Sequence, residues 1–291
     1  MRKVLLIFLV TCFSLILSAQ LSLAGSIFLT GHDPDFHASN AAGTAVDSIG
    51  AVHINEIGVD FIMNAAFNPF VSGGINKFLF VESMIAPPGG HRRGVNGIVQ
   101  SGFISGTDFE HHDASTLGAE LLLLGTKYSG IVIASDFGGL LTQAELDILN
   151  AGSAGIINFL NLGGGLYAMA EGNSGSGLTP GGGHFGFLPF IVSSTGLNQN
   201  EAGTTVTPFG ASLGLTNADV SSNFSHNIFN NSFGLDVVDR DSAGQILTLA
   251  GRPAVITPGG VGAVPEPSTI LLLGTGLAGL AACRYRKGKK V

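Results

Sequence analysis

Short apolar runs alternate with helical patterns over residues 26–170, and this alternation predicts an α/β fold. Residues 51–65 carry apolar side chains at helical spacing. Residues 142–160 do so too, behind a capping box of Thr142 and Glu145 and ahead of a terminating glycine run. Continuous apolar runs typical of buried strands cover residues 26–30, 77–81, 130–135 and 166–170. Because strand, helix and strand follow one another, we expect a doubly wound, mostly parallel sheet.

The pattern changes in the later part of the chain. Residues 188–257 are rich in Asn, Ser, Thr and Gly, which favour turns over long regular elements. We therefore expect a C-terminal part of short strands and long loops. Together with the earlier pattern, this predicts one α/β domain over residues 25–257.

The N-terminus has the layout of a secretory signal peptide. A basic start, Met1-Arg2-Lys3, precedes an apolar run over residues 4–17, and small residues lead up to Gly25. The alternative is a permanent membrane anchor, but the run is shorter than the ~20 residues that a membrane span needs. We therefore expect residues 1–24 to be a signal peptide.

The C-terminal segment has the order of a stop-transfer signal. A linker, residues 258–263, precedes Pro265-Glu266-Pro267. An uncharged apolar stretch over residues 268–283 then leads into a basic tail, which is typical of a transmembrane helix with its basic end in the cytoplasm. As a helix the stretch measures about 24 Å against a hydrocarbon core of about 30 Å. The helix spans the membrane only if the bilayer thins locally or the basic side chain that follows the helix snorkels to the interface. Such a helix suits recognition by a membrane enzyme better than firm anchoring.

Pro265, Glu266 and Pro267, the apolar helix and the basic tail together resemble the PEP-CTERM sorting signal, over residues 264–291. That family of signals is found in Gram-negative bacteria that make extracellular polysaccharide, and a membrane peptidase called exosortase processes it. The resemblance implies an exosortase-type peptidase as a partner and membrane contact through residues 268–283 before processing. It also implies delivery to the cell envelope or the extracellular matrix, with extracellular polysaccharide as a further partner. It implies nothing about the domain that is delivered.

Charge and cysteine content exclude several functions for that domain. Residues 26–264 hold six basic and 19 acidic side chains, a net charge of 6 minus 19, or −13. This argues against binding to nucleic-acid phosphates or anionic lipid. The two cysteines, Cys12 and Cys283, both lie in the terminal apolar segments. A disulfide framework, a zinc-thiolate site and a cysteine nucleophile are therefore absent from the domain.

Two segments resemble the class I glutamine amidotransferase-like domains. They are residues 128–136, Tyr-Ser-Gly-Ile-Val-Ile-Ala-Ser-Asp, and residues 163–172, which follow the capped helix. The resemblance implies a flavodoxin-like fold. Active members of the family place a cysteine nucleophile at the turn after the last of these strands, where this chain has Ala170 or Glu171. Alanine offers no lone pair for a base to activate, so thiol chemistry and glutaminase activity are not expected.

Polar side chains follow the predicted strands, at the sheet edge where doubly wound proteins bind ligands. Two imidazoles and a carboxylate within six residues, His32, Asp33 and His37, are a candidate set of ligands for a divalent metal. Further candidate ligand-binding residues are Glu82, Asp136, Glu171 and His184, and residues 110–113 are a candidate strand end. The alternative is that these residues mark where the chain leaves the core, with Asp33-Pro34-Asp35 as a simple turn.

Two functions of different class remain open. The first is an exported cell-envelope or extracellular-matrix protein whose non-catalytic domain associates with a ligand or polysaccharide. The second is a metal-assisted hydrolase that uses a His/Asp/Glu cluster at the carboxyl edge of the sheet. Because no complete set of nucleophile and base is present, the sequence favours the first.

Overall fold

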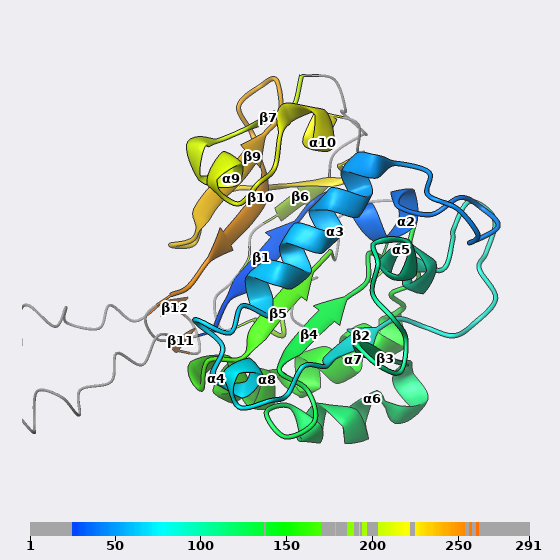
Figure 1. Cartoon of the computed structure of the whole chain (residues 1–291), viewed down its shortest axis with the longest axis vertical. Helices are drawn as coiled ribbons and strands as arrows, with labels where there is room; N and C mark the ends of the chain where they lie inside the picture. The colour runs from blue at the N-terminus through cyan, green and yellow to red at the C-terminus, as the bar shows by residue number, and fades with distance from the viewer. Residues whose placement is uncertain are drawn as a thin grey trace, which may run out of the picture. The chain divides into compact units, whose positions relative to one another are not determined.

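A ten-stranded mixed sheet forms the centre of the domain (Figure 1). The computed structural model describes residues 25–136, 138–169, 178, 185–188, 192, 194–196, 203–221, 225–253, 256–257 and 260–261. The strands of the sheet are β1 (Ile27–Thr30), β2 (Phe78–Val81), β3 (Phe109–His112), β4 (Gly130–Ile133), β5 (Gly165–Ala168), β6 (Ser194–Gly196), β7 (Thr205–Val206), β8 (Asn227–Phe229), β9 (Asp236–Arg240) and β10 (Ile246–Gly251). A separate two-stranded pair joins β11 (Ile256–Thr257), at the end of the predicted domain, to β12 (Gly260–Val261), within the segment expected to be a linker.

The first five strands are parallel and adjacent, as the alternating pattern predicts. Their order across the sheet is β3-β2-β4-β5-β1. Strand β10 then pairs antiparallel with β1 and extends the sheet into β8, β6, β9 and β7. The sheet is therefore parallel in the part predicted from residues 26–170, and antiparallel in the part built from the loop-rich later residues.

Four of the five parallel strands, β1, β2, β4 and β5, bury both of their faces, which explains the continuous apolar runs. Ile131 and Ile133 of β4 face one apolar core, and Val132 between them faces the other. Strands β1, β2 and β5 alternate in the same way. Because successive side chains of a strand point to opposite faces, only a strand covered on both sides needs apolar residues at every position.

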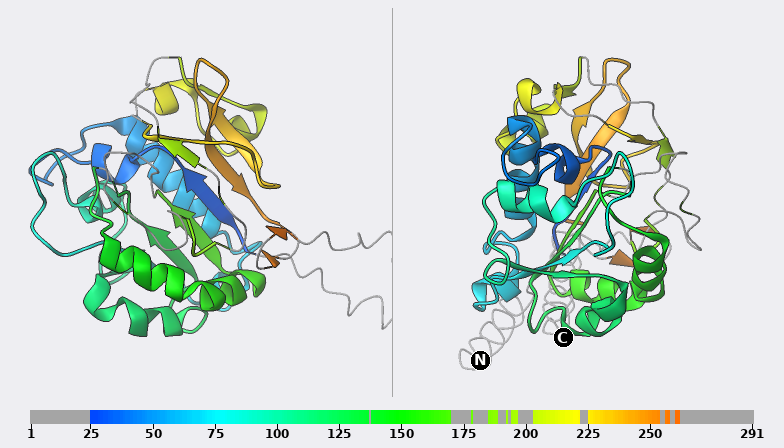
Figure 2. Two further views of the ribbon diagram at one scale, coloured as in Figure 1. Left: turned by 180° about the vertical axis from the view of Figure 1, so that it is seen from behind. Right: turned by 90° about the vertical axis from the view of Figure 1, so that its right-hand side faces the viewer.

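Helices cover the two faces of the sheet. On one face, α3 (Ile49–Ile62) and α5 (Gly94–Gln100) contribute Ile54, Phe61 and Ile98 to the core. On the other face lie α6 (Ala114–Glu120), the 3-10 helix η1 (Leu121–Leu123), α7 (Gln143–Ala151) and α8 (Ser153–Asn161), as Figures 1 and 2 show from front and back. The remaining helices are α2 (Pro34–His37), α4 (Pro69–Ser72), α9 (Pro208–Ser212) and α10 (Asn217–Ser221). The sheet is thus wound on both faces.

The predicted helix over residues 142–160 is two helices. The capping box of Thr142 and Glu145 is present and starts α7, as expected. Gly152 then ends α7 and precedes α8, with its amide bonded back to the carbonyl of Ile148 at 2.8 Å. Apolar spacing alone did not reveal this break because both helices bury the same side, with Leu146 and Ile156 in one core.

The strand order departs from that of flavodoxin when strands are counted from the N-terminus. A flavodoxin-like sheet has the order 2-1-3-4-5. Here β2–β5 occupy the first four of those positions, and β1, the first strand of the chain, takes the fifth. The N-terminal strand pairs with both β5 and β10, so it lies inside the sheet and not beside β2. The α/β class is confirmed, and the predicted flavodoxin-like connection does not hold at β1.

Several predicted segments lie outside the described residues. They are the signal peptide (residues 1–24), Glu171, His184, and the sorting signal with its transmembrane helix at 268–283. Among the residues that the structure describes, no helix has the length and apolar character needed to cross a membrane.

Candidate functional site

The turn that follows β1 places two of the predicted ligands close together. Asp33 is the N-cap residue of α2, and Pro34 begins the helix. Proline suits this position because its ring presets φ and its missing N–H has no helical partner there. His37 ends the same helical turn, four residues after Asp33, and its Nε2 lies 3.4 Å from Asp33 Oδ1. This proximity is local, because residues four apart share one face of a helix.

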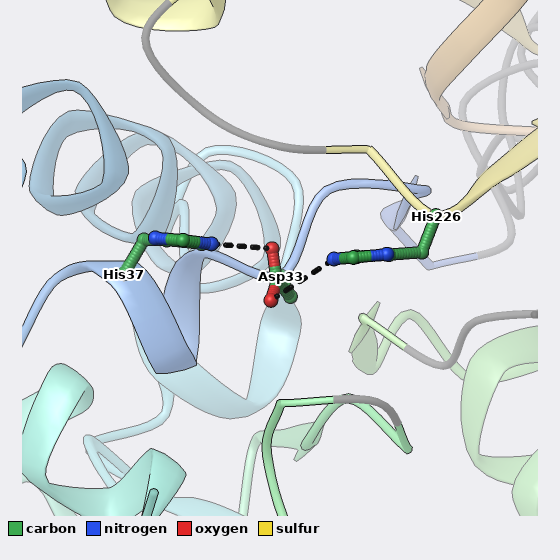
Figure 3. Close-up of side chains that lie close together, drawn as sticks. All are labelled: Asp33, His37 and His226. Carbon is green, nitrogen blue, oxygen red and sulfur yellow. Dashed lines mark ion pairs between the residues drawn. The ribbon is translucent and has the colours of Figure 1, made fainter. Parts of the chain in front are cut away.

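A third side chain reaches Asp33 from the antiparallel part of the sheet. The His226 amide donates to the carbonyl of Gly31 at 2.7 Å, and Ser225 bridges His32 in antiparallel pairing. This pairing brings the start of β8 against the end of β1. His226 Nε2 then lies 3.4 Å from Asp33 Oδ2, opposite His37 (Figure 3). We call Asp33, His37 and His226 the Asp33 cluster.

The Asp33 cluster is buried, and burial dominates its electrostatics. Asp33 and His226 are each 1 % exposed. Burial raises the pKa of Asp33 to about 7, against the opposing pull of the neighbouring His37. Burial also lowers the pKa of His226 to about 4, and that of His37 below its usual range. Uncharged histidines beside a carboxyl group present nitrogen lone pairs, the form in which imidazole binds metals.

His32, predicted with Asp33 and His37 as a metal ligand, is bonded elsewhere. Its Nε2 lies 2.9 Å from Asp239 Oδ2, and both side chains are fully or almost fully buried. Asp239 belongs to β9, on the antiparallel side of the sheet. Since successive residues of an extended chain point in opposite directions, His32 and Asp33 separate here. His226 takes the place in the cluster that the sequence assigned to His32.

A second group of buried carboxyls lies beside the first. Asp35 Oδ2 accepts a hydrogen bond from the Ser135 amide at 2.9 Å, which ties the turn after β1 to the end of β4. Glu82, which follows β2, accepts from the amides of Gly94 and Val95 at the start of α5. The two carboxyls meet at Gly94, where a Cβ atom would lie 2.5 Å from Asp35 Oδ2 and 3.0 Å from Glu82 Oε1.

Both carboxyls of this pair have raised pKa values. Burial raises the pKa of Asp35 to about 7 and that of Glu82 to about 8, and the charge of Asp35 contributes to the second shift. Glu82 also faces His111, whose Nε2 lies 3.4 Å from Glu82 Oε2. The predicted candidate Glu82 therefore supports α5 and does not join the Asp33 cluster.

Stability is expected to fall as pH rises from about 7 to about 8.5. The folded pKa values of Asp33, Asp35 and Glu82 exceed their ordinary values of 3.8, 3.8 and 4.5, so the folded state holds more protons in this range. The buried histidines act oppositely, but only below about pH 6.5, because above it they are neutral in both states. Urea unfolding at the two pH values measures the change.

A substitution of Glu82, whose pKa is the highest of the three, tests its share of this pH effect. Glu82→Gln cannot titrate, so the stability of this variant should vary less between the two pH values. Asp147→Asn, on the exposed side of α7, should keep the slope of the unchanged protein. A stability that stays level or rises towards pH 8.5 in the unchanged protein would contradict the prediction.

The remaining candidate site residues lie partly within and partly outside the described residues. Asp136 follows β4, is 4 % exposed, and its charge acts on His226. Asp136 therefore lies in the electrostatic surroundings of the Asp33 cluster. Glu171 and His184 lie outside the described residues. Glu110 and His112 belong to strand β3 itself, and Asp113 caps α6 through the Ser115 amide.

The comparisons identify the C-terminal signal. Residues 263–287 match the model of the PEP-CTERM protein-sorting motif. No curated protein and no solved structure matches the chain. The sorting signal predicted from Pro265-Glu266-Pro267 is thus confirmed. The motif implies an exported protein that membrane-associated exosortase recognises and sorts to the cell surface.

Proposed function

We propose that this chain is an exported cell-envelope or extracellular-matrix protein whose α/β domain acts by binding, not by catalysis. The observation that carries the proposal is the PEP-CTERM motif at residues 263–287. A signal-peptide pattern precedes the domain and the motif follows it, so both ends of the chain carry targeting signals. In this proposal the two signals deliver the domain, and its binding partners lie outside the cytoplasm.

A binding role is supported by the chemistry of the domain. Residues 25–262 contain no cysteine, so the thiol nucleophile of the amidotransferase-like enzymes is missing. Polar side chains instead gather where β1, β2 and β4 end, and doubly wound sheets bind ligands beyond these ends. We propose this carboxyl edge as the binding region and extracellular polysaccharide as the partner of the exported protein.

Processing at both termini is the test of this function. In the native host we expect cleavage near Ala24 and near Pro267, because the two signals bracket the domain. Replacing Pro265, Glu266 and Pro267 together by alanine should retain the protein in the membrane fraction with its basic tail attached. Intact mass measurement of the protein from the envelope and the medium distinguishes these states.

The matched control replaces Pro258, which precedes the motif, by alanine. This variant should be processed and exported as the unchanged protein is. If all exported protein still carried the basic tail, the proposed sorting would be wrong. Association with polysaccharide is measured in the same fractions, where enzymatic digestion of the matrix should release the mature protein into the medium.

A metal-assisted hydrolase is the second candidate. The observation that favours it is the Asp33 cluster, in which two imidazoles approach one buried carboxylate. A metal ion bound by three protein ligands keeps a position for water, and it lowers the pKa of that water enough to make a nucleophile. Hydrolysis of an ester, amide or glycoside by the metal-loaded protein, lost in His226→Ala, would favour this function over the first.

A further inference from the structure

The Asp33 cluster combines ligands from two distant segments. Asp33 and His37 come from the N-cap and the last residue of α2, and His226 directly precedes β8. One ligand atom from each residue lies within 4.8 Å of the other two. Figure 3 shows the imidazoles on opposite sides of the Asp33 carboxylate, each directing a nitrogen towards it.

Asp33 carries an independent sign that the cluster takes a cation. Its side chain is 1 % exposed, and Oδ1 has no hydrogen-bond partner within the part of the chain that the structure describes. Buried carboxylate oxygens are normally hydrogen-bonded, because burying one without a partner is costly. Oδ1 faces His37 Nε2 at 3.4 Å, a separation typical of two ligands of one ion and long for a direct bond.

The surrounding charges are mostly negative. Asp35 and Asp136 both act on His226. Opposing charge near Asp33 comes from His32 and Arg92, and Arg92 also acts on His37. The Arg92 guanidinium is already bonded to Asp47 at 2.7 Å, which offsets much of its charge. A cation within the cluster would therefore lie in a favourable field.

We propose that Asp33, His37 and His226 bind one divalent transition-metal ion. This inference rests on the proposed binding role of the carboxyl edge and names its ligand. The donor set of two imidazole nitrogens and a carboxylate oxygen selects zinc, nickel, cobalt or iron(II), and disfavours calcium and magnesium, which prefer oxygen ligands. Ligands about 2.1 Å from a tetrahedral metal lie about 3.4 Å apart, and each imidazole lies 3.4 Å from a different oxygen of Asp33, His37 from Oδ1 and His226 from Oδ2.

A second group of candidate ligands provides an internal contrast. Glu110, His112 and Glu120 also place ligand atoms within 4.8 Å of one another. Here, however, Lys127 Nζ lies 2.7 Å from Glu110 Oε2 and 3.0 Å from Glu120 Oε2. An ammonium group already occupies the position of the cation, so this group is not expected to bind a metal.

Metal titration of the purified protein tests the proposal. Untagged protein from the exported fraction is stripped with a chelator and titrated with Zn²⁺ by calorimetry and with Co²⁺ by visible absorption. We expect one site per chain, cobalt d–d bands, and no comparable binding of Mg²⁺ or Ca²⁺. His37→Ala and His226→Ala should each weaken Zn²⁺ binding by about 100-fold or more, since loss of outer-shell partners alone costs 10–100-fold.

The control variant is His112→Ala, from the group already neutralised by lysine, and it should bind Zn²⁺ as the unchanged protein does. Circular dichroism checks that each variant is folded, and His37, with a partly exposed side chain, is the variant least dependent on that check. Absence of Zn²⁺ and Co²⁺ binding, or equal binding by folded His37→Ala, would overturn the metal site. Either result leaves the proposed export untouched, because processing is measured separately in the native host.

Discussion

Replacing Gly97 by alanine is expected to lower the free energy of unfolding by about 3 kcal/mol, at the upper end of the usual cost of overpacking. Gly97 lies in α5, where a Cβ atom would overlap the carbonyl oxygen of Asp35 and lie 2.7 Å from its carbonyl carbon. These are backbone atoms of α2, so no side-chain rotation relieves the overlap. The two helices must move apart, and Asp33 and His37 move with α2.

Gly118→Ala is the matched control. Gly118 also lies within a helix, α6, but a Cβ atom there would meet no atom within 4 Å. Alanine is the better helix former, so this variant should be unchanged or up to about 1 kcal/mol more stable. Urea unfolding of both variants gives the difference. Equal stabilities would show that α2 and α5 are not packed as closely as described.

Replacing Asn68 by alanine is expected to cost about 3 kcal/mol as well. The Asn68 side chain is 1 % exposed and makes four hydrogen bonds. Nδ2 donates to the carbonyls of Ile62 and Ser129 at 3.0 and 2.7 Å, and Oδ1 accepts from the amides of Phe70 and Val71. Alanine removes the cap of α4 and leaves buried backbone groups without these partners.

Asn64→Ala is the comparison for this prediction. Asn64 is exposed, and its Oδ1 accepts from the Ala66 amide at 3.0 Å. Its removal should change stability by no more than about 0.5 kcal/mol, as is usual for surface positions. Thermal or urea unfolding compares the two variants directly. A loss at Asn68 as small as that at Asn64 would mean that water or neighbouring groups replace the four bonds.

The strands buried on both faces were readable from the sequence. Residues 77–81 and 130–135 are apolar at almost every position, and they form β2 and β4 with small shifts at the ends. β3 was expected only as a strand end, because Glu110 and His112 interrupt its apolar character. β3 lies at the edge of the sheet, where it has one neighbouring strand and Glu110 pairs with Lys77 and Lys127.

The sorting signal could be predicted from the sequence because it is defined by the order of residues along the chain. Pro265-Glu266-Pro267, an apolar stretch and a basic tail succeed one another along the chain, and their order suffices for the match. The position of β1 was not readable. It pairs with β5 and with β10, strands far from it in the sequence, and no local pattern in residues 26–30 specifies these long-range partners.

The candidate site, too, could be predicted from the sequence only in part. The sequence by itself determined that Asp33 and His37 lie together, because four residues make one helical turn and Pro34 begins that turn. Only the tertiary structure decided that His226 completes the cluster and that His32 turns to Asp239. The physical reason is the antiparallel pairing between the end of β1 and the start of β8, which no local pattern around either histidine specifies.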